Sequence, residues 1–164
     1  MNLFNKAKRK DPEAFEKLMR DELSGMYRIA YSMLHNDEDV ADAIQDTMLK
    51  CWEKIDTLKE PSFFRTWLIR ILINNCNDVL RKRKVIISLD DVPDMPTSDN
   101  YCEDDWKEII QTLDDKYRLV MELYYIEELQ TQEIAKMLGI SDDNVRRRLS
   151  RGRKQLEKIV KETF

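Results

Sequence analysis

The sequence predicts an all-α protein made of two small helical domains joined by a flexible linker. Only 3 glycines and 4 prolines occur in 164 residues, so few turns are marked and long helices are expected. Apolar residues recur at steps of three and four, which is the spacing of amphipathic helices. A polar, proline-containing stretch interrupts this pattern. It places the first domain at residues 1–84, the linker at residues 85–103 and the second domain at residues 104–164.

Three helices are expected in the first domain. Asp11 and Pro12 mark the start of the first, because proline is favoured at the first helical position and acids suit the first turn. A polar stretch at residues 35–39 ends this helix. Apolar residues at helical spacing then predict a second helix over residues 40–55 and a third over residues 62–84.

Charge is distributed unevenly, although the net charge is only −4. Residues 85–105 hold 7 acidic residues and no basic one. Residues 144–161 hold 8 basic residues against a single acid, Glu157. Arginine and lysine concentrated on one helix are typical of a nucleic-acid contact. The net charge is small because the acidic linker offsets the charge of this basic helix.

The strongest motif is a helix-turn-helix in the second domain, after short helices expected around Trp106 and Tyr117. Gly139 permits the positive φ that ends the first helix of the motif. Ser141 is a good N-cap for the second helix, which Val145 and other apolar residues are expected to anchor in the core. A recognition helix of this kind can enter the DNA major groove, where arginine binds guanine or phosphate.

The 100° step of an α-helix predicts which side chains of this second helix face DNA. Arg146 and Lys154 lie further around the helix from this face, and we expect them to contact phosphates or solvent. The alternative is a charged, solvated helix on an ordinary bundle, but six basic residues from 146 to 154 without an acid are hard to explain in that way. The residues expected closest to DNA are Asn144, Arg147, Arg148 and Arg151.

Two helices of the first domain also carry candidate contact surfaces. On the second helix Ile44, Met48 and Trp52 are expected in the core, while the opposite face combines acids, an amide and the apolar Leu49, which would suit either solvent or a protein partner. On the third helix, aromatic residues alternate with arginine and asparagine. Most of these aromatics are expected in the core, but the combination also suits single-stranded DNA, where bases stack and cations hold phosphates.

These segments resemble regions of the extracytoplasmic-function (ECF, group IV) sigma factors of the sigma-70 family. Residues 42–52 are similar to region 2.2, residues 64–74 to regions 2.3–2.4, and the helix-turn-helix to region 4.2. The three motifs occur in the family's order and together cover nearly the whole chain. The resemblance implies a sigma2-like bundle and a sigma4-like helix-turn-helix domain.

The resemblance also implies what each region binds. Region 2.2 contacts core RNA polymerase, regions 2.3–2.4 melt and read the promoter −10 element, and region 4.2 reads the −35 element. The implied polymerase-binding residues are Asp42, Gln45, Asp46, Leu49 and Glu53. The implied −10 residues are Phe64, Arg65, Trp67, Arg70, Asn74, Arg81 and Arg83. The implied −35 residues are Thr131, Ser141, Asn144, Arg146, Arg147, Arg148 and Arg151.

Three partners follow from the resemblance. They are core RNA polymerase, through its β′ clamp helices and β flap, promoter DNA, and an anti-sigma protein that is usually membrane-anchored in this family. The resemblance further implies a role in a stress or cell-envelope response. The chain departs from the family at Asp143-Asn144, where Gly-Thr is common, and at residues 146–148, where Lys-Ser-Arg is common, so promoter preference cannot be carried over.

Other functions fit less well. No cofactor, metal or catalytic site is predicted, because the chain has no Gly-rich phosphate loop or metal-ligand spacing and its one histidine, His35, lies in a polar context. Cys51, Cys76 and Cys102 form no CxxC pair, which favours a reducing cytosol. No apolar run approaches the roughly 18 residues of a membrane span, so a cytoplasmic protein is expected.

Two alternative classes of binding protein remain beside the sigma factor. A stand-alone helix-turn-helix regulator usually dimerises and reads half-sites about one helical turn apart. This chain instead combines one helix-turn-helix with a second domain that has its own Trp/Arg/Asn helix. A helical adaptor without DNA binding is the third class.

Overall fold

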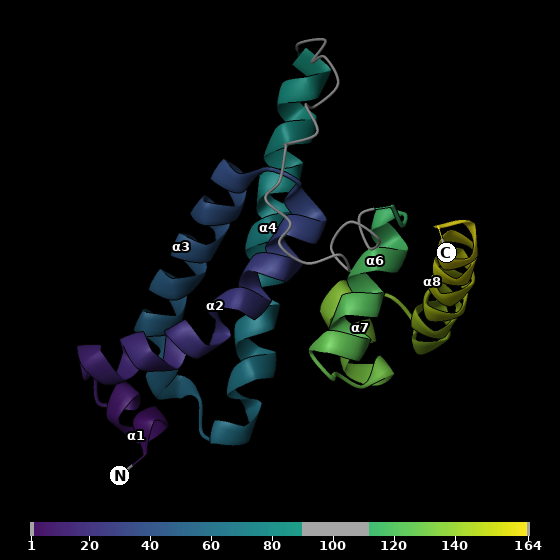
Figure 1. The fold of residues 1–164 in the computed structure, drawn as a ribbon. Helices are drawn as coiled ribbons and strands as arrows, with labels where there is room; N and C mark the ends of the chain where they lie inside the picture. The colour runs from purple at the N-terminus through teal and green to yellow at the C-terminus, as the bar shows by residue number, and fades with distance from the viewer. Residues whose placement is uncertain (1, 90–111, 164) are drawn as a thin grey trace. The chain divides into compact units, whose positions relative to one another are not determined.

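The computed structural model describes residues 2–89 and 112–163, with side-chain surroundings given for residues 2–83 and 112–162. All regular secondary structure in these ranges is helical, as Figure 1 shows, so the predicted all-α fold is confirmed. The chain divides into two compact units, Met1–Thr97 and Ser98–Phe164. Most of the predicted linker, and the helix expected around Trp106, lie outside the described residues.

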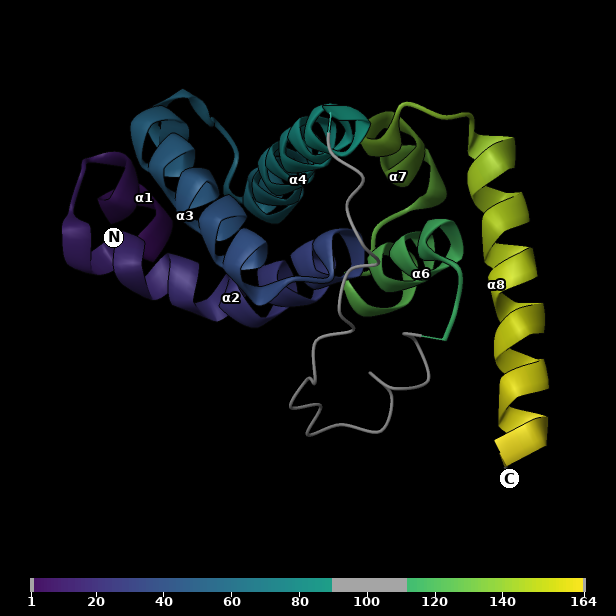
Figure 2. The same cartoon turned by 90° about the horizontal axis from the view of Figure 1, so that it is seen from above.

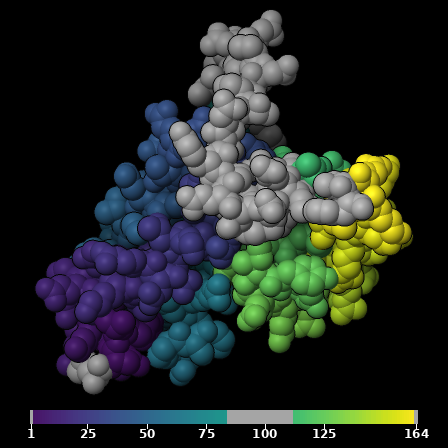
Figure 3. All heavy atoms as spheres, in the orientation of Figure 1, coloured from purple at the N-terminus to yellow at the C-terminus, as the bar shows by residue number. Residues whose placement is uncertain are grey.

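The N-terminal unit is built from helices that pack pairwise around one core. In chain order its elements are α1 (Leu3–Lys8), α2 (Pro12–Leu34), α3 (Asp37–Lys54), the 3₁₀ turns η1 (Ile55–Thr57) and η2 (Pro61–Phe63), and α4 (Phe64–Leu89). Helices α2, α3 and α4 each contact the other two. On the face that Figure 3 shows, the side chains of α2 lie next to those of α1 and those of α3. The largest fully buried side chains of the unit are Met19, Met26, Ile29, Leu34, Val40, Ile55, Leu68, Leu72 and Ile73.

Caps define the corner between α2 and α3. The Asp11 side chain accepts hydrogen bonds from the backbone of Glu13 and Ala14 at 3.1 and 3.4 Å, which confirms the predicted start of α2. Helix α2 ends where His35 adopts a left-handed conformation with φ 54°. The Asn36 side chain then accepts the backbone N–H of residue 39 at 3.0 Å, so α3 begins three residues before the predicted position.

Helix α1 is not predicted from the sequence, because six residues are too few to establish a periodic pattern. Its buried side chains are Phe4 and Ala7. The Phe4 ring meets the edge of the Phe64 ring at a centroid distance of 6.0 Å, so α1 closes the core at the start of α4. At its other end α4 continues to Leu89, five residues beyond the predicted end of the third helix.

The C-terminal unit carries the helix-turn-helix. Helix α6 (Asp115–Met121) continues into a π-helical turn η3 (Glu122–Ile126), followed by α7 (Thr131–Leu138) and α8 (Asp142–Thr163). Figure 2 shows α8 as one long helix beside α6 and α7. The helix around Tyr117 is confirmed, but the sequence did not predict that its last turn widens to a π-helix. Such turns are frequent at functional sites.

Local contacts confirm the motif as predicted. Gly139 has φ 68°, and the Ser141 hydroxyl accepts the backbone N–H of Asn144 at 3.1 Å. Val145 and Leu149 are fully buried. Further along α8, a Cβ at Gly152 would stand 3.0 Å from the Met121 side chain, so glycine permits the close approach of α8 to α6.

The turn makes a stability prediction. A Cβ at Gly139 would meet no atom within 4 Å, so a substitution there costs only the left-handed conformation. We expect Gly139→Ala to lower the free energy of unfolding by about 1–2 kcal/mol. Gly139→Asn should cost less, because asparagine tolerates this region. Urea denaturation followed by circular dichroism measures both variants, and equal losses for Ala and Asn would contradict this account of the turn.

Candidate nucleic-acid and protein interfaces

Helix α8 presents a basic face to solvent. Arg146, Arg147 and Arg151 are exposed, and the last two make no hydrogen bond or ion pair with any other residue that the structure describes. Asn144 and Arg148 are half-buried, and the Arg148 Nε donates to Asn144 Oδ1 at 3.0 Å. The fully exposed face is therefore rotated from the predicted one, toward Arg146 and away from Asn144 and Arg148. Their i, i+4 spacing in the sequence could have indicated this pair.

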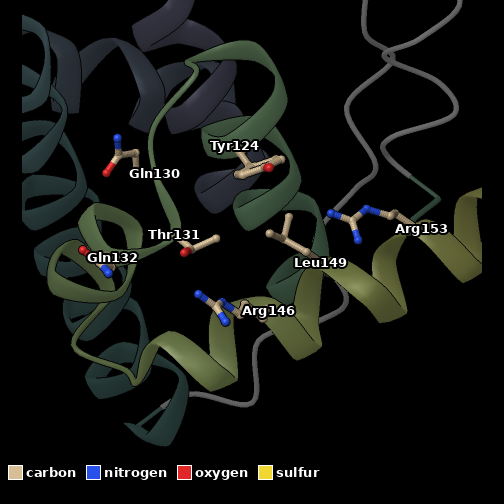
Figure 4. A pocket seen from close by; sticks show the side chains of 7 residues that line it. All are labelled: Tyr124, Gln130, Thr131, Gln132, Arg146, Leu149 and Arg153. Atoms are coloured by element: carbon tan, nitrogen blue, oxygen red, sulfur yellow. The ribbon is translucent and has the colours of Figure 1, made fainter.

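A hollow of about 560 Å³ opens on the flank of the helix-turn-helix (Figure 4). Its lining residues are Tyr124, Gln130, Thr131, Gln132, Arg146, Leu149 and Arg153. Arg146 also pairs with Asp142 at 2.9 Å, and Arg153 donates to the Tyr125 hydroxyl at 2.5 Å. Thr131 begins α7, where the first backbone N–H groups carry partial positive charge. Two guanidinium groups beside a helix N-terminus favour an anion such as a DNA phosphate.

Helix α4 presents a polar stripe. Arg70 and Asn74 are exposed, lie one helical turn apart and have no hydrogen-bond or ion-pair partner among the described residues. Arg81 is 72% exposed in its side chain and pairs with Asp78. Trp67 is half-buried next to Phe64, with ring centroids 6.1 Å apart. The stripe therefore combines arginine hydrogen-bond donors with the amide of Asn74 on one side of α4. The opposite side of this helix is buried in the core.

Phe64 does not join this stripe, although it was predicted as a −10 contact. It is 5% exposed and packs between Phe4 and Trp67, whereas the preceding Phe63 is 58% exposed. The sequence does not distinguish Phe63 from Phe64, because two adjacent aromatic residues at a helix start do not reveal which one faces the core. The exposed aromatic of this segment is therefore Phe63, in the 3₁₀ turn before α4.

Two of the arginines predicted to bind the −10 element, Arg65 and Arg83, pair with carboxylates on other helices. Arg65 Nε lies 3.5 Å from Glu22 Oε2. The Arg83 side chain is only 18% exposed. It pairs with the Asp39 carboxylate and donates to the Leu34 carbonyl at 2.9 Å. Arg83 thus joins α4 to the corner between α2 and α3, which leaves little of its charge available to a phosphate.

The outer face of α3 is fully solvent-facing. All five residues implied for polymerase binding are exposed on it, and Leu49 is the most conspicuous because 61% of this apolar side chain is accessible. The opposite face buries Ile44, while Met48 and Trp52 are half-buried rather than fully in the core. An exposed leucine framed by acids and an amide offers an apolar side chain inside a polar rim, which suits contact with a protein partner. The five exposed residues are Asp42, Gln45, Asp46, Leu49 and Glu53.

An apolar groove of about 550 Å³ lies in the C-terminal unit between the π-helical turn and α8. Tyr125 and Val160 are its exposed apolar residues, at 50% and 39%. Arg153, Glu157 and Lys161 give it a charged rim, in which Lys161 pairs with Glu157 at 3.0 Å. The remaining lining residues are Met121, Ile126 and Leu156. This groove fits an apolar segment of a protein partner rather than DNA.

The two cysteines that the structure describes are both buried. Burial raises the pKa of the Cys51 and Cys76 thiols to about 12, so both stay protonated and unreactive near neutral pH. In the part of the chain that the structure describes, no three His, Cys, Asp or Glu side chains cluster as metal ligands. No helix within the described ranges is both long and apolar enough to span a bilayer.

Comparison with known proteins identifies the family. Residues 18–85 match sigma-70 region 2, and residues 104–156 match sigma-70, region 4. The RNA polymerase sigma factor SigV of Bacillus subtilis (strain 168) is 30% identical over 138 residues, which span 82% of this chain and 83% of SigV. The ECF RNA polymerase sigma factor SigW of the same strain is 29% identical over 174 residues. This match covers 94% of this chain and 93% of SigW.

The fold agrees with these matches. The structure of the sigma factor RpoE in complex with the anti-sigma factor NepR from Bartonella quintana superposes with a TM-score of 0.69 at 23% identity, over 89% of this chain and 98% of RpoE. This likeness shows that the two chains share a fold. The chain belongs to the sigma-70 family, within its ECF group.

The two adjacent phenylalanines make a paired prediction. Phe64→Ala should lower the free energy of unfolding by about 3–5 kcal/mol, because it empties a core site. Phe63→Ala should change stability by less than about 0.5 kcal/mol, since its side chain is mostly in solvent. Thermal or urea unfolding of the two variants measures the difference. A larger loss for Phe63→Ala than for Phe64→Ala would contradict the assignment of which ring is buried.

Proposed function

We propose that this protein binds core RNA polymerase through α3, reads and opens the promoter −10 element with α4 and the turn before it, and reads the −35 element with α8. Membership of the ECF group makes it a promoter-specific transcription initiation factor. Sigma factors are regulators of transcription rather than enzymes. The observation that carries the assignment of surfaces is that exposed faces of α3, α4 and α8 coincide with the segments similar to regions 2.2, 2.3–2.4 and 4.2.

Polymerase binding is assigned to the outer face of α3. Leu49 can bury its exposed side chain in a partner, while Asp42, Gln45 and Asp46 supply a polar rim. The partner we propose is the pair of β′ clamp helices. The apolar groove beside α8 is proposed as the site of a second polymerase contact, the β flap, because an apolar groove with a charged rim suits an amphipathic helix.

The −10 contact is assigned to the exposed stripe of α4. Unstacking a base costs a few kcal/mol, so an open promoter needs protein groups that receive the displaced strand. Phe63 offers a stacking surface at the start of the helix, and Arg70 and Asn74 follow along it. Trp67 and Arg81 extend the same surface. Phe64 and Arg83 are left out because of their burial and internal partners.

The −35 contact is assigned to the exposed face of α8. Arg147 and Arg151 are the best candidates for base edges, since no described partner competes for their guanidinium groups. We propose that a DNA phosphate binds in the hollow lined by Thr131, Arg146 and Arg153. Phosphate contacts fix the position of the recognition helix, and the base contacts supply sequence preference.

An anti-sigma protein is proposed as the regulatory partner, since RpoE of the comparison structure forms a complex with the anti-sigma factor NepR. A membrane-anchored partner and a stress or cell-envelope response are the extensions that the family resemblance suggests. The cytoplasm is the proposed location, because core RNA polymerase acts there. No observation favours a stand-alone helix-turn-helix regulator.

The polymerase surface can be tested by substitution on α3. Gln45→Ala combined with Asp46→Ala should weaken binding to purified core polymerase about tenfold, because these residues frame the exposed Leu49. Helix content should not change. A fluorescence titration with core polymerase measures the affinity, and Glu13→Ala on the exposed side of α2 serves as the matched control. Wild-type affinity in the double variant would refute the assignment of α3.

The recognition helix can be tested with a promoter library in which the −35 element is randomised. Arg147→Ala should cost about 1–3 kcal/mol and relax the preference at one base pair. Arg148→Ala should change base preference less, because Arg148 is half-buried against Asn144. Transcripts are sequenced for wild type and both variants. The account of α8 is contradicted if Arg147→Ala keeps the wild-type preference while Arg148→Ala loses it.

A further inference from the structure

Helices α3 and α4 are joined by two polar contacts that no surface role explains. In the first, the mid-helix contact, Asn75 Nδ2 donates to Thr47 Oγ1 at 2.9 Å and Lys50 Nζ donates to Asn75 Oδ1 at 2.7 Å. Thr47 in turn donates to the Ala43 carbonyl at 2.7 Å. Thr47 and Asn75 are buried, so the hydrogen bond between them lies inside the packed interface, whereas Lys50 reaches Asn75 from an exposed position on α3.

The second, the corner contact, is the one that Arg83 makes. Its guanidinium group pairs with the carboxylate of Asp39 in the first turn of α3, and it donates to the carbonyl of Leu34, the last residue of α2. A cation suits the carbonyl end of α2, where the helix dipole is negative. The contact therefore ties α4 to two helices at once.

The two contacts have the same spacing on both helices. Eight residues separate Asp39 from Thr47 on α3, and eight separate Asn75 from Arg83 on α4. At 1.5 Å per residue this is about 12 Å on each helix. Because the higher number on α3 pairs with the lower number on α4, the helices run antiparallel, and both contacts require the same register. A slip of α4 along α3 by one turn would break both.

We propose that Asn75 and Arg83 are positioning residues that fix the register of α4 against α3. Apolar packing between two helices tolerates several registers, whereas a buried polar group loses its partner in all but one. The inference rests on the proposed function, in which α3 docks on polymerase and α4 reads the −10 element. The register then sets how far the DNA-reading stripe of α4 stands from the docked face of α3.

This role differs from a DNA contact by Arg83, and the salt dependence of promoter binding separates the two. A residue that binds phosphate adds about one unit to the slope of log affinity against log salt. Arg83→Met should leave this slope unchanged in the holoenzyme, whereas Arg81→Met, at an exposed position two residues away, should reduce it. A reduced slope for Arg83→Met would overturn the positioning role of Arg83.

The register itself is measured by the distance between spin labels on the two helices. Labels at Lys54→Cys and Asn77→Cys occupy exposed positions in a Cys102→Ser background, and the buried Cys51 and Cys76 stay unreactive because burial raises their pKa to about 12. The distance distribution is recorded for the free full-length protein. The two contacts are removed separately, by Thr47→Val with Asn75→Leu and by Asp39→Ala with Arg83→Met, and then together. Thr47→Ser keeps the hydroxyl and is the matched control.

We expect a single narrow distance in the wild type and in Thr47→Ser, and a broad or shifted distribution when both contacts are removed. In the same variant, core polymerase binding should persist, while open-complex formation at saturating polymerase, read by permanganate, should fall about tenfold. Circular dichroism checks that each variant retains its helix content. If the variant that lacks both contacts loses helix, the same distances and promoter opening are measured in the two variants that each lack one contact.

Two results would overturn the proposal: an unchanged distance distribution, or a broadened one with wild-type promoter opening. If the wild-type protein itself fails to bind core polymerase, the proposed function fails, and the distance measurement still decides whether the contacts set the register.

Discussion

The packing of α3 against α4 is the contact on which the N-terminal unit depends. Each helix has one face in this interface and the opposite face in solvent. Burying apolar side chains such as Ile44, Leu68 and Leu72 is worth about 25 cal/mol per Å² of surface removed from water. This term holds the helices together, but it is non-directional, so register comes from the polar contacts at Asn75 and Arg83. In this interface, apolar burial thus stabilises the packing of the two helices, and the polar contacts fix their register.

The functional surfaces follow from what this packing leaves outside. The exposed residues include Leu49 on α3, and Arg70 and Asn74 on α4. The C-terminal unit repeats the arrangement, since α8 buries Val145 and exposes Arg147. In every case the side chains that we propose to bind a partner are carried on a helix whose other face is core, so binding should need little further ordering of the chain.

Features set by local chemistry could be predicted from the sequence. The Gly139 turn and the Ser141 cap depend on residues within a few positions of each other, and both were found as expected. Features set by distant partners could not. Phe64 rather than Phe63 is buried because α1, a helix too short to predict, places Phe4 beside it. Arg83 looked like part of a basic run because its partner Asp39 lies 44 residues away.

The central claim is that this protein gives promoter specificity to RNA polymerase rather than acting on DNA alone. The most direct measurement is run-off transcription with purified core polymerase from a library of random promoter sequences, with and without the protein. The account predicts transcripts from a narrow set of start sites that share a −35 and a −10 sequence, and only when the protein and core polymerase are both present. Transcription indistinguishable from that of core polymerase alone would contradict it, as would equally selective DNA binding by the protein without polymerase.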